Sequence, residues 1–65
     1  TAIEQINVIE RIVDIFPEDE FLIFSDDEAF LLNSINNIFQ RITNSKNNID
    51  ESTARVIIEK LNEKY

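Results

Sequence analysis

The first 16 residues carry apolar side chains over an unusually wide arc of a helix. Wound at about 100° per residue, the segment 2–16 spreads its apolar positions over roughly half of the circumference, whereas a surface helix needs an apolar stripe of only about 100°. These positions are Ile6, Val8, Ile9, Ile12, Val13, Ile15 and Phe16. A capping box of Thr1 with Glu4 starts this helix, and Pro17 ends it. Because one neighbouring helix cannot cover such an arc, we expect contacts on two flanks, one of them with another molecule.

Two further apolar stripes predict two more helices. Residues 26–43 carry apolar side chains at spacings of three and four, and Ser25 with Glu28 forms a capping box ahead of them. A shorter stripe covers residues 50–64, and the turn-forming residues 43–48 separate the two helices. The sequence therefore predicts an all-α fold, a small three-helix bundle that oligomerisation completes.

The segment 17–24 between the first two helices has two interpretations. Pro17 followed by three acids resembles a short helix start, whereas residues 21–24 are β-formers that are able to run extended. We expect a short helical turn or a buried connector, because a lone strand would find a partner only in its own copy in a dimer. We also expect Phe24 to contact the first turn of the next helix. Phe30 lies off the apolar stripe, so it either packs on residues 21–24 or is exposed for a partner.

The chain is short for a self-sufficient core. It has 65 residues with no Cys and no His, so neither a disulfide nor the usual zinc ligands supplement hydrophobic burial. Self-association is the device that remains, which favours a dimer or tetramer. Because the sequence lacks Met and begins at a capping residue, we expect a single domain, residues 1–65, excised from a larger protein.

The net charge of -7 at pH 7, from 6 basic and 13 acidic residues, restricts the partners. Nucleic acids and anionic membranes attract basic surfaces, so we expect this chain to bind neither directly. No apolar run approaches the ~20 residues of a membrane span, and the N-terminus lacks a signal-peptide pattern. We therefore expect an intracellular protein, cytoplasmic or nuclear.

Two acidic triplets are the most prominent polar feature of the chain. They consist of Glu18, Asp19, Glu20, Asp26, Asp27 and Glu28. Acids are favoured at the positive end of the helix macrodipole, so the triplets either mark two helix starts or form a docking patch for a basic protein. A calcium loop of the EF-hand type is not expected, because both its ligand spacing and its glycine are missing.

The residues that catalysis needs are scarce. No His is available as a base and no Cys as a nucleophile, and Lys46, Lys60 and Lys64 occupy positions predicted to face solvent. We therefore expect no enzymatic activity, no cofactor and no metal site. The amides that flank the second stripe, among them Asn36 and Gln40, either tolerate a polar contact between subunits or reflect coding bias.

The stretch Leu32-Asn33-Ser34-Ile35 is loosely similar to the Asp-Ser-Leu attachment site of acyl carrier proteins, small acidic helical domains in which the serine holds phosphopantetheine. Asn33 stands where that family has aspartate, the preceding glycine is absent, and Ser34 falls well inside the predicted helix. The resemblance implies an acyl-carrier-like domain with Ser34 as the attachment site.

The leading functional hypothesis is a non-catalytic homo-oligomerisation module, a dimer or tetramer that holds together copies of a larger intracellular protein. Its expected interface consists of Ile6, Val8, Ile9, Ile12, Val13, Ile15, Phe16 and Phe30. The alternative is a monomeric acidic adaptor or inhibitor that binds a basic protein surface through residues 18–28. The expected partner is a second copy of the chain or, in the alternative, another protein with a basic or apolar surface. A rise in ionic strength weakens a charge-driven complex and leaves an apolar oligomer nearly unchanged, so salt separates the two.

Overall fold

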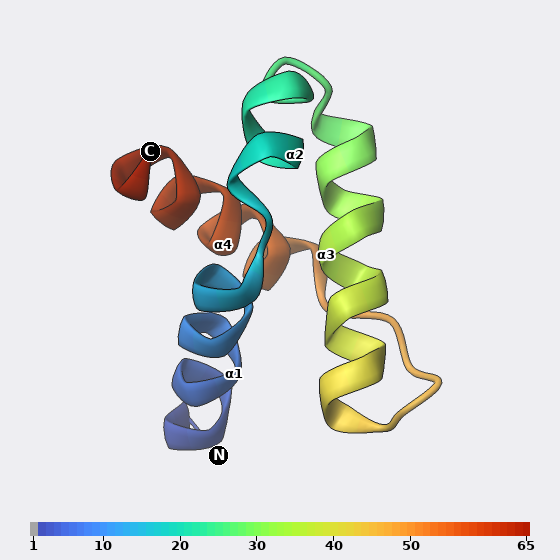
Figure 1. The fold of residues 1–65 in the computed structure, drawn as a ribbon. Helices are drawn as coiled ribbons and strands as arrows, with labels where there is room; N and C mark the ends of the chain where they lie inside the picture. Colours follow the sequence, from blue (N-terminus) through green and yellow to red (C-terminus); the bar gives the residue numbers. More distant parts are fainter. Residues whose placement is uncertain (1) are drawn as a thin grey trace.

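The structure, a computed structural model, describes the backbone of residues 2–65 and the side chains of residues 6–65. Its helices are α1 (Ala2–Ile15), α2 (Glu18–Ile23), α3 (Glu28–Thr43) and α4 (Glu51–Lys64). Figure 1 shows α1 and α3 running in opposite directions, α4 crossing both, and α2 at the end where α1 leads into α3. The all-α prediction is confirmed for these residues, with four helices instead of three.

The wide apolar arc of α1 packs against two neighbours from its own chain. α1 contacts both α3 and α4, and Ile12 and Phe16 are 0% and 2% exposed. The half-buried Val8, Ile9 and Val13 pack against the same core. The chain itself therefore supplies the second neighbour that the sequence led us to assign to another molecule.

One hydrophobic core joins all four helices. Its buried members are Ile12, Phe16, Phe21, Leu31, Ile35, Ile38, Ala54, Ile57 and Leu61. The spacings of three and four along α3 and α4 match those of the two predicted stripes, which are confirmed as inward faces. The radius of gyration is 10.9 Å, close to the value of about 10.7 Å for a compact chain of this length.

The prediction that Ser25 caps the helix of residues 26–43 is wrong. Asp27 is the N-cap of α3, because its Oδ1 accepts a hydrogen bond from the Phe30 backbone N–H at 3.0 Å. Ser25 lies in the preceding turn, where its hydroxyl donates to the Leu22 carbonyl at 3.5 Å. α3 therefore begins two residues later than expected, since α2 continues to Ile23 and the chain needs the intervening residues to turn.

The segment after Pro17 is helical, in agreement with the expected helical turn. Pro17 is the N-cap of α2 at φ -64° and ψ 125°, and the six-residue helix starts with three acids. The alternative of an extended segment is wrong, because residues 21–23 belong to this helix, and the expected buried connector holds only in part. Phe21 is buried, whereas Leu22 and Ile23 are exposed.

Asn44 ends α3 in place of the glycine that the chain lacks. Its backbone is left-handed, with φ 52° and ψ 41°, and its N–H and that of Ser45 both reach the Gln40 carbonyl. Asn is one of the few residues other than Gly that adopts this conformation readily. The predicted break at residues 43–48 is confirmed, and α4 begins after Asp50.

The amino-terminal capping box of Thr1 with Glu4 lies outside the described residues and side chains. Within residues 2–65, no helix has both the length and the apolar character that a bilayer crossing requires.

Candidate functional site

The buried aromatic ring of Phe21 attaches α2 to the ends of α1 and α4. Phe21 is 3% exposed and contacts two other rings, one from the end of α1 and one from the end of α4. Its ring centroid lies 6.4 Å from that of Phe16, edge to face, and 5.6 Å from that of Tyr65. Such aromatic pairs add roughly 0.5–1.5 kcal/mol each beyond area burial. This cluster sets which side of α2 faces inward.

Two more contacts fix the orientation of α2 against α3. The Ser34 hydroxyl donates to Glu20 Oε1 at 3.0 Å, and the rings of Phe24 and Phe30 stack with centroids 3.8 Å apart. Of the two alternatives for Phe30, packing on residues 21–24 is therefore confirmed, as is the expected contact of Phe24 with the first turn of α3. Ser34 lies well inside α3, half-buried, with its hydroxyl engaged by a carboxylate.

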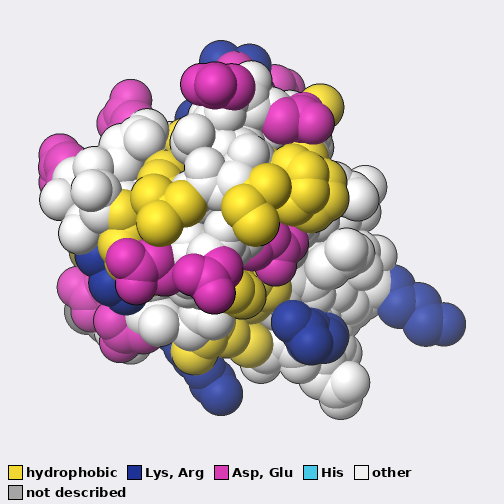
Figure 2. Space-filling view, turned by 45° about the horizontal axis from the view of Figure 1, so that its top comes forward, with side chains coloured by type: hydrophobic (Ala, Val, Ile, Leu, Met, Phe, Trp, Pro, Cys, Tyr) yellow, Lys and Arg dark blue, Asp and Glu magenta, His cyan; other side chains and the backbone are white. Residues whose placement is uncertain are grey.

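These contacts leave an apolar pair on the outside of α2. Leu22 is 54% exposed and Ile23 is 72% exposed, the highest value among the large exposed hydrophobic side chains. Glu18 and Asp19 are also exposed and stand one helical turn before them, since positions four apart share a helix face. We call Glu18, Asp19, Leu22 and Ile23 the α2 surface. Figure 2, which brings this end of the molecule forward, shows apolar side chains reaching the surface among acidic ones.

The six acids of the two triplets divide into two groups. Three have structural partners: Asp27 caps α3, Glu20 accepts from Ser34, and Glu28 lies 3.3 Å from the Arg55 guanidinium. The other three, Glu18, Asp19 and Asp26, are exposed. Among the side chains of residues 6–65, no basic group forms a salt bridge with any of these three.

Arg55 is the basic residue that α4 contributes near this acidic region. It donates to Glu51 Oε1 at 3.0 Å, and this hydrogen bond, with the charges of Glu28 and Glu51, raises the pKa of its guanidinium. The pairs are exposed and contribute little to stability. These pairs reduce the negative charge at the start of α3, but they leave the negative charge of α2 unchanged.

The residues of the predicted self-association interface differ widely in exposure. Ile12 and Phe16 belong to the core of the single chain and expose no usable surface to a second copy. Val8, Ile9, Val13 and Phe30 are half-buried, while Ile6 and Ile15 are 53% and 49% exposed. Nine positions separate Ile6 from Ile15, about 180° around the helix, so these two side chains cannot form one patch.

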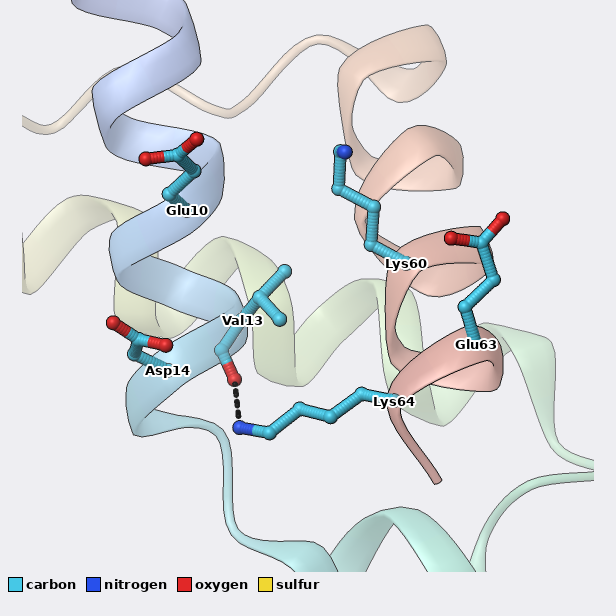
Figure 3. Close-up of a pocket in the computed structure, with 6 residues that line it drawn as sticks. All are labelled: Glu10, Val13, Asp14, Lys60, Glu63 and Lys64. Carbon is cyan, nitrogen blue, oxygen red and sulfur yellow. Dashed lines mark hydrogen bonds between the residues drawn. The ribbon is translucent and has the colours of Figure 1, made fainter.

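A shallow groove of about 420 Å³ separates α1 from α4 and carries charges of both signs. Its lining consists of Glu10, Val13, Asp14, Lys60, Glu63 and Lys64. Figure 3 shows that the Lys64 side chain crosses from α4 to α1, where its Nζ donates to the Val13 carbonyl at 3.1 Å. Glu10 and Asp14 project from α1 without meeting Lys60 or Glu63. The groove is open, and its charged groups do not converge on one point.

Sequence reasoning missed the role of the last two residues. Lys64 and Tyr65 both donate to carbonyls near the carboxyl end of α1, Tyr65 through its hydroxyl to Phe16 at 3.4 Å. α1 has no basic residue in its own last turn, so the chain end supplies the donors that this helix end needs. The absence of a basic residue from the last turn of α1 was the sequence feature that pointed to a donor from elsewhere. It does not indicate which distant residue provides that donor.

Two of the amides of α3, those of Asn36 and Gln40, form hydrogen bonds within the chain. Asn36 Oδ1 accepts from the Ile49 N–H at 2.8 Å, and Gln40 Nε2 donates to the Lys46 carbonyl at 3.3 Å. These bonds hold the loop between α3 and α4 against α3. The polar flank that we considered for a subunit contact therefore has an intramolecular role at both positions.

In the part of the chain that the structure describes, no group of three or more acidic side chains is placed to hold a metal ion. Comparison with known proteins finds no matching protein family, no matching characterised protein and no matching solved structure.

Proposed function

We propose that this domain is a non-catalytic protein-binding module that uses the α2 surface to bind a partner with a basic surface. One observation carries the proposal: two adjacent aliphatic side chains, Leu22 and Ile23, are more than half exposed beside carboxylates that form no salt bridge with the side chains of residues 6–65. A single exposed Leu is ordinary in a soluble protein. Two adjacent exposed aliphatic side chains beside acidic ones are stronger evidence of a binding surface, because the apolar pair provides the contact and the negative charge favours a basic partner.

The charge of this region has one sign over a long stretch. Between Arg11 and Arg41 the sequence contains no Lys and no Arg, and α2 lies within that stretch. Two copies that met through their α2 surfaces would place acids against acids, because a two-fold contact uses the same patch on both sides. Like charges in contact oppose association, whereas a basic partner is attracted and guided to the surface. The charge therefore favours a different protein as partner.

Self-association is the second candidate function, supported by the exposed Ile15 and the half-buried Val8 on one side of α1. It would make the chain a dimer or tetramer module of a larger intracellular protein. A stable interface takes roughly 800 Å² and some 20–30 residues from each partner. This side of α1 offers two partly exposed side chains, so an interface of that size would also have to include the acidic α2. For that reason self-association is the second candidate.

The mass of the domain in solution separates the two functions. We would measure it by sedimentation at a low and a high protein concentration, each in about 0.01 M and about 0.15 M salt. The proposal expects a monomer in all four conditions. A mass that rises with protein concentration and persists in salt would replace the proposal with self-association.

Binding itself is tested by capture of a partner from the source cell on immobilised domain. The double variant Leu22→Ala with Ile23→Ala removes the apolar pair, and Val56→Ala, at a 39% exposed position on α4, is the matched control. The proposal expects a protein that the wild type and the control retain, that the double variant loses, and that salt releases. Retention by all three forms would place the binding elsewhere on the molecule.

A further inference from the structure

The α2 surface has a fixed internal geometry that restricts its occupant. Glu18 and Leu22 are four positions apart, as are Asp19 and Ile23, so each aliphatic side chain has a carboxylate about 5–6 Å before it along the helix. The α2 surface thus consists of an apolar pair, Leu22 and Ile23, and an acidic pair, Glu18 and Asp19, one helical turn apart. A partner segment that matches it needs an apolar pair and a basic pair with the same separation.

We propose that the occupant of the α2 surface is an amphipathic helix of another protein, with two adjacent aliphatic residues and basic residues three to four positions away on the same face. This inference rests on the proposed function and specifies its partner. On a helix, side chains three and four positions apart lie on one face about 5–6 Å apart, the spacing expected on α2. In an extended segment, residues two positions apart lie about 7 Å apart on one face, so the backbone that the partner must pair with, and not the spacing, decides between a strand and a helix.

Other occupants fit this surface less well. A second copy of the chain and an anionic membrane both bring negative charge to the carboxylates of Glu18 and Asp19. An extended strand has no sheet edge to join, because residues 2–65 form no strand. A helix that lies beside α2 needs no free backbone groups, and its side chains fill the grooves next to Leu22 and Ile23.

The contact area limits the affinity. α2 has six residues, fewer than two turns, so the partner helix contacts it over a similar length. The neighbouring Glu28 is already paired with Arg55, so it does not add a free negative charge to the acidic pair of α2. We therefore expect a transient complex in the micromolar to millimolar range, with a strong dependence on salt.

Two synthetic peptides of identical composition test the inference. In the patterned peptide, a Leu-Ile pair lies four positions from a Lys-Lys pair on one helical face. In the permuted peptide the lysines lie on the opposite face. Titration into isotopically labelled domain, followed by NMR chemical shifts, measures each dissociation constant and shows which residues respond. The wild type is compared with the variants L22A/I23A and E18Q/D19N and with the control V56A.

We expect the patterned peptide to bind the wild type and V56A about tenfold more tightly than the permuted peptide, with shifts centred on α2. Both double variants should remove this preference, E18Q/D19N together with the salt dependence. If both peptides bind equally at the α2 surface, the inference is overturned, whereas the proposed function stands, because the surface still binds a basic, apolar partner. If neither binds, or if shifts centre on another face, the inference is also overturned. A wild-type mass that doubles on concentration and reverts in L22A/I23A would make the occupant a second copy, which overturns both.

Discussion

Phe21 and Ile23 are two positions apart on the same short helix, and substitution to alanine should affect them very differently. Phe21 is 3% exposed between the rings of Phe16 and Tyr65, whereas Ile23 is 72% exposed. Truncation of a buried Phe removes about 3–5 kcal/mol, and truncation of a surface residue changes stability by less than about 0.5 kcal/mol. The free energy of unfolding of a 65-residue domain is about 3–10 kcal/mol. Phe21→Ala therefore removes much of the total stability, and Ile23→Ala almost none.

Urea denaturation followed by circular dichroism at 222 nm measures this difference. For a domain of this size each kcal/mol also shifts the melting temperature by about 4–8 °C, so a thermal scan gives an independent value. Because Phe21→Ala is at risk of complete unfolding, Phe21→Leu, with an expected cost of about 1 kcal/mol, keeps the comparison measurable. Equal losses for Phe21→Leu and Ile23→Ala would show that α2 is not docked through the Phe21 ring, and the assignment of an inner and an outer side to α2 would fail.

Three further predictions concern helix ends, each measured by the same urea denaturation. Asp27→Ala should cost about 1 kcal/mol and Ser25→Ala less than about 0.5 kcal/mol, and the reverse order would restore Ser25 as the cap of α3. Asn44→Ala should cost about 1 kcal/mol because of the left-handed backbone, whereas Asn44→Gly should be neutral or stabilising, so equal losses would contradict that conformation. Tyr65→Phe should cost about 0.5–1 kcal/mol through the lost hydrogen bond to the Phe16 carbonyl, and no loss would make that bond irrelevant to stability.

The inward faces of α3 and α4 were predictable because their cause is local. Ile35 and Ile57 lie in regular runs of apolar residues at spacings of three and four, and such runs identify a buried face wherever the helix packs. The same periodicity misled us about α1. It showed that the arc was wide, but the number of helices that the chain itself brings to that arc is a property of the tertiary fold.

The start of α3 was mispredicted because three candidate caps follow one another in the sequence. Ser25, Asp26 and Asp27 all have side chains that accept hydrogen bonds from a helix start. The choice among them depends on the stacking of Phe24 on Phe30 and on the length of α2, and both require the position of α2 against α3. A local motif thus narrowed the boundary to within two residues, and packing decided the rest.

The candidate site was only partly predictable for a related reason. Its acids, Glu18 and Asp19, were evident from charge alone. The exposure of Leu22 and Ile23 was not, because it follows from the rotation of α2, which Phe21 sets by contact with Tyr65. A contact between residues so far apart in the chain leaves no periodic signal in the sequence around α2.

The short length of the chain and its lack of Cys and His give only weak support for self-association. A short domain without disulfides gains stability from oligomerisation only if a copy covers apolar surface that the fold leaves exposed. On α1 only Ile6 and Ile15 of the described large aliphatic side chains are exposed, on opposite sides of the helix, since Ile12 and Phe16 are already covered by the chain's own helices. The larger exposed aliphatic surface lies on α2, where Glu18 and Asp19 disfavour a second acidic copy. Exposure and charge together therefore support the proposal of a different, basic protein as partner, and this proposal fails if the wild-type domain dimerises in about 0.01 M salt, where repulsion between acidic surfaces is least screened.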